Sequence, residues 1–175
     1  MNYWAIGIGG MVIIGVFVWK TYNDFIIKRI NVERQASHVE VHLKKKFDMI
    51  PAIVEAVKGY SGHEKGTLEE VTRLRSQWGK ITSSEEKIKT ANMLESALSK
   101  LLIVQERYPQ LKANRNFMDL QKSIGYVERE LVHERKVYNK RVSWYNGTIQ
   151  LFPKNLIAKL FSFQEKQFFS MKDNE

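Results

Sequence analysis

The last third of this 175-residue sequence carries a seven-residue repeat of apolar side chains, which strongly limits what the chain can fold into. The repeat runs through Phe117, Ile124, Leu131, Tyr138, Tyr145 and Phe152, and the same stripe is widened by Leu120, Val127, Val142 and Ile149. A sustained heptad repeat is typical of a long helix with coiled-coil packing against nearly parallel neighbours. Pro153 follows the repeat and is expected to end this helix.

Helical periodicity also covers the first half of the chain. Apolar residues from Ile26 to Val57 recur mostly at steps of three or four, which predicts a helix over residues 21–60 with a kink at Pro51. The same spacing predicts a short helix over residues 67–78. Ser83 and Glu86 form a capping-box pattern, so a third helix is expected to start there and to run to Pro109.

These four helices lead to an all-α prediction. Only ten Gly and three Pro occur, which argues against a turn-rich β-sandwich or barrel. Short connections force neighbouring helices to run antiparallel, so we expect an up-down-up-down bundle of long helices over residues 21–163. Residues 164–175 are expected to form a C-terminal tail.

The N-terminal segment predicts a membrane anchor over residues 1–20. Residues 1–19 contain no side chain that is charged at neutral pH, and Lys20 is the first charge. The seventeen residues from Tyr3 to Trp19 would span about 26 Å as a helix, the short end of the transmembrane range. Tyr3, Trp4 and Trp19 place aromatic rings at both ends, as in an interfacial belt. The alternative is a buried helix of a soluble fold.

The charges that flank this segment predict its orientation. No Lys or Arg precedes it in this sequence, whereas Lys20, Lys28, Arg29 and Arg34 follow it closely. The positive-inside rule therefore predicts a single-pass protein of the cell membrane, with its N-terminus outside and its helical domain in the cytoplasm.

Residue types that carry chemistry are sparse. The chain has no Cys, which excludes disulfides, cysteine-ligated metals and thiol catalysis. His38 and His42 lie four residues apart, but neither they nor His63 and His133 belong to an HExxH motif. Nucleotide-binding glycine motifs are also missing. We therefore predict no catalytic residue, no bound metal and no cofactor.

The formal net charge of +9 suits an anionic partner, and Lys44, Lys45 and Lys46 form the densest basic cluster. A solvated helix face beside Glu40 and Asp48 is the favoured interpretation of this cluster. A phosphate-binding patch is the alternative, but no aromatic residues are interleaved with the lysines for base stacking. Nucleic acid is therefore not a favoured partner.

Two further features are candidate sites. Glu128 and Arg135 are seven residues apart beside the heptad stripe, so they are expected to form a buried or half-buried polar pair that sets the register of the helices. A functional polar pocket is the alternative.

The C-terminal segment forms a candidate interface through Phe161, Phe163, Phe168 and Phe169. Because the last helix should return toward the anchor, we expect the stretch from Pro153 to Phe169 near the bilayer. Packing on the bundle, lying on the lipid headgroups and contacting a neighbouring subunit are the alternatives for these residues.

Several motifs resemble the LemA family, and the resemblance is collinear from Tyr22 to Phe163. The motifs are Phe47-Asp48-Met49-Ile50-Pro51, Val57-Lys58-Gly59-Tyr60, His63-Glu64, Glu106-Arg107-Tyr108-Pro109-Gln110-Leu111-Lys112-Ala113-Asn114, Phe117, Leu120-Gln121, Tyr138-Asn139, Tyr145-Asn146, Phe152-Pro153, Leu156-Ile157-Ala158 and Phe163. The family's usual Thr-Glu-Asn-Arg segment is Val127-Glu128-Arg129-Glu130 in this chain. The family's tryptophan on the first helix is replaced by Ala36, while Trp78 replaces a small residue, so one exchange compensates the other if the two positions face each other.

The resemblance implies a bacterial, membrane-anchored four-helix bundle without established catalytic activity. Magnetosome-forming members of the family suggest, by analogy, a role in membrane organisation. We therefore expect a non-enzymatic scaffold or interaction protein that contacts the lipid bilayer, forms homo-oligomers and binds other membrane proteins. The alternative is an accessory or regulatory subunit of a membrane metallopeptidase or transporter, because such peptidases often accompany the family.

Overall fold

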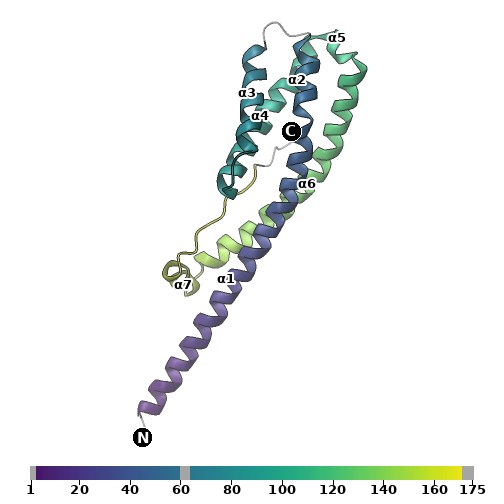
Figure 1. Cartoon of the computed structure of the whole chain (residues 1–175). Coiled ribbons are helices and arrows are strands. Elements are labelled where there is room, and N and C mark those ends of the chain that lie inside the picture. Colours follow the sequence, from purple (N-terminus) through teal and green to yellow (C-terminus); the bar gives the residue numbers. More distant parts are fainter. Residues whose placement is uncertain (1–2, 60–63, 171–175) are drawn as a thin grey trace.

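A computed structural model describes residues 3–59 and 64–170, and all regular elements among these residues are helices (Figure 1). In chain order they are α1 (Tyr3–Asp48), α2 (Ile50–Lys58), α3 (Lys65–Trp78), α4 (Ser84–Ile103), the 3-10 helix η1 (Val104–Arg107), α5 (Pro109–Lys112), α6 (Arg115–Gln150) and α7 (Lys154–Leu160). The prediction of an all-α chain is thereby confirmed.

Helix α1 joins the apolar N-terminal segment to the helical domain without a break. We expected the first domain helix to begin near Thr21, but the backbone is already helical from Tyr3 and remains so to Asp48. The change from apolar to charged side chains at Lys20 leaves the main-chain hydrogen bonds of a helix intact, so it does not end one. The boundary at residue 20 is therefore one of chemistry and not of backbone conformation.

The expected kink at Pro51 takes the form of a short interruption at Met49. Pro51 lies in the first turn of α2, where its missing amide hydrogen costs nothing. Met49 keeps right-handed helical angles, with φ −82° and ψ −15°, and its amide donates to the carbonyl of Lys46 over 3.2 Å. The chain thus continues from α1 into α2 in nearly the same direction (Figure 1).

The starts of α4 and α6 differ in how they are capped. Ser83 is the N-cap of α4, as predicted, but its side chain makes no capping hydrogen bond. At α6 the side chain of Asn114 accepts a hydrogen bond from the amide of Phe117 over 3.1 Å. That bond satisfies one of the amides that a helix start leaves unpaired.

The heptad stripe of α6 lies in the core over most of its length. Phe117, Ile124, Leu131, Tyr138 and Tyr145 are all buried. The prediction is wrong for the last member: Phe152 follows the end of α6 at Gln150 and is 80% exposed. Leu151 adopts an extended conformation with ψ 133°, so the stripe does not continue past it.

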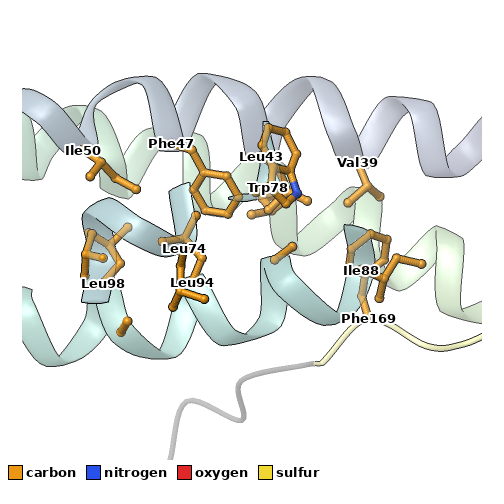
Figure 2. Close-up of a cluster of buried hydrophobic side chains, with 14 of the residues drawn as sticks. Val39, Leu43, Phe47, Ile50, Leu74, Trp78, Ile88, Leu94, Leu98 and Phe169 are labelled. Atoms are coloured by element: carbon orange, nitrogen blue, oxygen red, sulfur yellow. The ribbon is translucent and has the colours of Figure 1, made fainter. Parts of the chain in front are cut away.

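The core lies where α1, α2, α3, α4 and α6 meet, and Figure 2 shows a part of it. Side chains of α1 and α2 (Val39, Leu43, Phe47, Ile50), of α3 (Leu74, Trp78) and of α4 (Ile88, Leu94, Leu98) interdigitate there, with Phe169 from the C-terminal segment. Ala36 and Trp78 line the same small cavity of about 30 Å³. The two positions therefore border a common space, which is the condition for one exchange to compensate the other.

The C-terminal segment reverses direction after α7. Helix α7 lies beside α1 on its N-terminal side, and residues 162–170 then run back along the helical domain (Figure 1). We expected the whole stretch to Phe169 near the bilayer, but Phe169 is buried and lines the same small cavity as Ala36, about 26 Å beyond Trp19 along the axis of α1. Its apolar ring is stabilised by the core instead of by the membrane.

The core position of Leu131 yields a prediction for stability. Leu131→Ala removes a side chain that is completely buried, so we expect the free energy of unfolding to fall by about 2–5 kcal/mol. Urea unfolding of the full chain in mild detergent, followed by circular dichroism, measures the change. Glu130→Ala alters an exposed neighbour and should stay within about 0.5 kcal/mol. Equal unfolding midpoints for the two variants would contradict the assignment.

Candidate functional site

The first candidate site is the N-terminal part of α1. The predicted anchor residues Tyr3, Trp4, Trp19 and Lys20 are all exposed, and so are most of the described side chains between them. Among the described residues, one helix near the N-terminus is long and apolar enough, by length and composition, to cross a membrane. Its exposed apolar surface is what a lipid-facing helix requires.

The second candidate site is a cluster of four charged side chains inside the helical domain. Lys46 of α1 places Nζ 2.6 Å from Oε2 of Glu95 on α4, and also binds the carboxylate of Glu128 on α6. Arg135 of α6 places Nη2 3.9 Å from Oε1 of Glu95, an ion pair without a hydrogen bond. Lys46, Glu95 and Arg135 are only 5%, 4% and 3% exposed. We call these four residues the buried ion cluster.

The buried ion cluster corrects the predicted pairing of Glu128 with Arg135. Both residues do face neighbouring helices, but each is bound to a different residue, and Lys46 and Glu95 stand between them. The two cations and two anions give the cluster no net charge. Removing charge from water costs several kcal/mol per ion, so this balance is needed for burial to be tolerated.

Two members of this site, Lys46 and Glu95, are not among the site residues predicted from the sequence. The prediction of a solvated face holds for Lys44 and Lys45, which are exposed, and is wrong for Lys46, which is buried. The spacing between each charged residue and the apolar residues before it is a sequence signal for this burial. Lys46 follows Leu43 by three residues, and Glu95 follows Ala91 by four, so each charge interrupts an apolar stripe at a core position.

A hollow of about 630 Å³ opens beside the cluster, between α1, α4 and α6. Lys46 and Glu128 form part of its lining, together with Ser99, Gln121 and Lys122. Glu128 is half-buried there and reaches both the hollow and the ammonium group of Lys46. The polar-pocket alternative for Glu128 therefore has a location in the structure.

The third candidate site is the Phe-rich C-terminal segment, whose four aromatic rings have different surroundings. Phe169 is buried against Tyr138, with ring centroids 4.9 Å apart, and the guanidinium of Arg135 lies 5.7 Å from its ring. Phe163 packs edge-on against Phe25 at 5.0 Å. Phe161 and Phe168 are about half exposed, so these two are available to contacts beyond the chain.

Hydrogen bonds between side chains of α6 and the main chain of this segment hold it along α6. We call the segment the strap (residues 163–170). Asn146 donates to the carbonyl of Lys166 and accepts from its amide, both over 2.9 Å. Asn139 binds the carbonyl and amide of Phe169 in the same way, over 2.9 and 3.0 Å. The hydroxyls of Tyr145 and Tyr138 donate to the carbonyls of Gln164 and Gln167, each over 3.0 Å.

The spacing of these contacts has a simple geometric cause. Asn139 and Asn146 are seven residues apart on a helix, which is about 10.5 Å along its axis. Their partners Lys166 and Phe169 are three residues apart in an extended chain, which is about 10 Å. The heptad repeat that forms the core thus also presents an Asn ladder whose period matches an extended peptide.

Three ionisable groups have shifted pKa values, two beside the strap and one between α1 and α7. Burial raises the pKa of Tyr138 to about 12 and also raises that of Tyr145, so both hydroxyls stay protonated and can donate to the strap at neutral pH. Burial would also raise the pKa of Asp24, but hydrogen bonds and charges from Lys28 and Lys154 outweigh it and hold that pKa below its usual value. Lys154 Nζ lies 3.2 Å from Asp24 Oδ2 and ties α7 to α1.

The histidines do not converge. His38 and His133 are exposed on different helices, His42 is half-buried, and His63 lies outside the described residues. Across the residues that the structure describes, no group of three or more His, Asp or Glu is placed to hold a metal ion.

These features define a class: an all-helical protein with a buried ion cluster and one N-terminal helix that could span a membrane. Comparison with known proteins identifies the family. Residues 35–175 match the LemA family, so the chain belongs to it.

The relatives cover different shares of the chain. Protein LemA of Metamycoplasma hominis is 21% identical over 154 residues, which is 87% of this chain and 70% of that protein. Magnetosome proteins MamQ 1 and MamQ 2 of Paramagnetospirillum magneticum are each 29% identical over 77 residues, or 44% of this chain. The matched region spans only 28% of each magnetosome protein.

The buried ion cluster predicts an unequal effect of two charge removals. Glu95→Gln leaves Lys46 and Arg135 buried with Glu128 as the remaining anion, so we expect a loss of about 3–5 kcal/mol in the free energy of unfolding. Glu106→Gln breaks an exposed pair with Lys112 and should cost at most about 1 kcal/mol. Urea unfolding in detergent measures both. A Glu95→Gln protein as stable as the unaltered chain would refute the cluster.

The Asn ladder predicts release of the strap when both amides are lost. Asn139→Ala with Asn146→Ala removes four hydrogen bonds to Lys166 and Phe169, each worth about 1 kcal/mol net. Amide hydrogen exchange over residues 164–169 should then accelerate at least about tenfold, because about 1.4 kcal/mol suffices for that change. Asn116→Ala, an exposed position on the same helix, is the matched control. Unchanged protection of the strap would count against the ladder.

Proposed function

We propose that this protein is a non-enzymatic scaffold, anchored in the cell membrane by the N-terminal part of α1 and presenting its helical domain to partners. The observation that carries the proposal is the continuity of α1. One uninterrupted helix bears an exposed, uncharged apolar segment at one end and core residues at the other. Such a helix transmits the position of an anchor rigidly to the domain that it carries.

The proposed domain is an antiparallel up-down-up-down bundle with coiled-coil packing. The contacts of α1 with the last part of the chain support this arrangement. Arg141 binds the carbonyl of Asn31, Glu134 binds Gln35, and Glu128 binds Lys46. Residue numbers rise along α1 while those of the partners on α6 fall, as antiparallel neighbours require.

In this proposal the domain is cytoplasmic and the N-terminus lies outside. The support is the positive charge that follows the apolar segment, on Lys20, Lys28, Arg29 and Arg34. Lys28 and Arg29 are partly exposed on α1, and Arg29 lies beside Phe163 of the C-terminal segment, so their charge lies on the same side of the membrane as the domain.

A scaffold rather than a catalyst fits how the charged groups are used. Lys46, Glu95 and Arg135, the deeply buried ionisable side chains of the cluster, are paired with one another and are therefore engaged in holding helices together. Partner surfaces are available elsewhere. A groove of about 920 Å³ between α2 and α3 is lined by Pro51, Val54 and Leu68, with basic and acidic residues around them.

Self-association and membrane organisation complete the proposal. The half-exposed rings of Phe161 and Phe168 support self-association, because large exposed apolar side chains favour contacts between proteins. Two of the relatives are named magnetosome proteins, and we extend a role at organised membranes to this chain by analogy.

Two measurements on the full chain test the proposal. Ser96→Cys places a single thiol on exposed α4 of this cysteine-free protein, and an impermeant maleimide should label it only after cells are lysed. Labelling of intact cells would overturn the orientation.

Sizing in mild detergent tests self-association. The full chain should elute as an oligomer, and Phe161→Ser with Phe168→Ser should reduce its size, while Tyr126→Ser, an exposed residue on α6, should not. Phe163 is avoided because it packs on Phe25 of its own chain. Monomers in every case would refute self-association. Recovery of a single membrane metallopeptidase or transporter by crosslinking would instead favour an accessory subunit.

A further inference from the structure

Large apolar side chains remain exposed on α7 and just before it. Leu151, Phe152, Leu156 and Leu160 are 62%, 80%, 58% and 74% exposed, and we call them the α7 patch. The opposite side of α7 is apolar as well, since Ile157 and Ala158 are buried in the core. The domain therefore uses one side of this helix and leaves the other without a partner among the residues that the structure describes. Exposed apolar side chains gathered in this way mark an interaction site.

Two contacts determine where the α7 patch lies relative to the anchor. Lys154 at the start of α7 pairs with Asp24, and Phe161 just after its end packs on Tyr22 with ring centroids 5.0 Å apart. Tyr22 and Asp24 lie three and five residues beyond Trp19, or about 5 and 8 Å along the helix axis. The headgroup layer on each side of a bilayer is about 5–8 Å thick. Both contacts therefore fall at headgroup depth when Trp19 lies at the edge of the hydrocarbon.

The length of the anchor points to the same depth. The seventeen residues from Tyr3 to Trp19 span about 26 Å, whereas a typical hydrocarbon core is about 30 Å thick. A span that is too short draws the flanking residues toward the bilayer or thins it locally. The flanking surface here is suited to that environment, because the α7 patch is accompanied by the exposed lysines Lys20 and Lys159, which match anionic headgroups.

We propose that the α7 patch inserts into the headgroup layer of the bilayer that α1 spans, as a second membrane contact next to the anchor. This inference rests on the proposed anchoring of α1. Lipid fits the patch better than a second copy of the chain does, because four side chains on and just before a seven-residue helix fall short of the roughly 800 Å² per partner of a stable protein interface. Two membrane contacts a short distance apart would fix the angle between the helical domain and the membrane. A single spanning helix would leave that angle free to change.

Depth-dependent fluorescence quenching on the full chain tests this. Because the protein has no Cys, Leu156→Cys and Leu160→Cys each provide a single site for an environment-sensitive fluorophore, and both positions are exposed, so the core is left unchanged. The labelled protein is reconstituted into phosphatidylcholine–phosphatidylglycerol vesicles that carry a spin label at a shallow or a deep position on the acyl chain. We expect a blue-shifted emission and loss of most of it with the shallow label, because interfacial helices bury about 5–10 Å deep.

Matched controls separate failure of this inference from failure of the anchor. Ser96→Cys on α4 should not be quenched, and Met11→Cys, about 12 Å from Trp19 in the middle of the apolar segment, should be quenched by the deep label. If Met11→Cys is not quenched, the proposed anchor fails and this inference fails with it. If Met11→Cys is quenched but Leu156→Cys and Leu160→Cys are not, the anchor stands and the α7 contact is overturned. Shielding of these two sites from aqueous iodide without lipid quenching would assign the patch to a protein partner and would also overturn it.

Discussion

The packing of α6 against α1 is the interaction on which the rest of this structure depends. These two helices share the most extensive contact between elements in the described part of the chain, and the other helices cover the sides of that contact. Heptad spacing on α6 keeps its apolar stripe facing α1 and α2 over about ten turns, so these helices stay in register over that length. Because α1 also carries the apolar N-terminal segment, the register of this packing decides how far from that segment each part of the domain lies.

Charges at core positions make the register specific. An apolar stripe alone tolerates sliding by one heptad, since one apolar side chain can replace another with a small loss. Sliding α6 past α1 by seven residues would move Glu128 about 10 Å from Lys46 and leave buried charges unpaired, at a cost of several kcal/mol. The buried ion cluster thus lowers the number of alternative packings, although its own contribution to stability is modest.

The strap shows a second use of the heptad. On its core-facing side the repeat supplies Tyr138 and Tyr145, whose rings pack in the interior while their hydroxyls reach the strap. The residues that follow each tyrosine, Asn139 and Asn146, bind both the amide and the carbonyl of one strap residue. Because these bonds are made to the backbone, the Asn ladder fixes the path of the strap for any sequence. The side chains of Phe163 and Phe169 determine which sequence fits along that path.

Local sequence patterns determined the elements of this protein: the helices, most of their ends, the buried stripe of α6 and the apolar segment of α1. All of these depend on neighbours within a turn or two, which is the range over which spacing, capping and proline act.

Tertiary structure decided the rest, because it depends on residues far apart in the chain. Lys46 and Glu95 are 49 residues apart, so no local pattern could pair them, although each interrupts an apolar stripe. The return of the strap likewise depends on a match between the rise of a helix and that of an extended chain. Phe152 became exposed because the backbone turned at Leu151, one residue before the repeat would have placed it in the core.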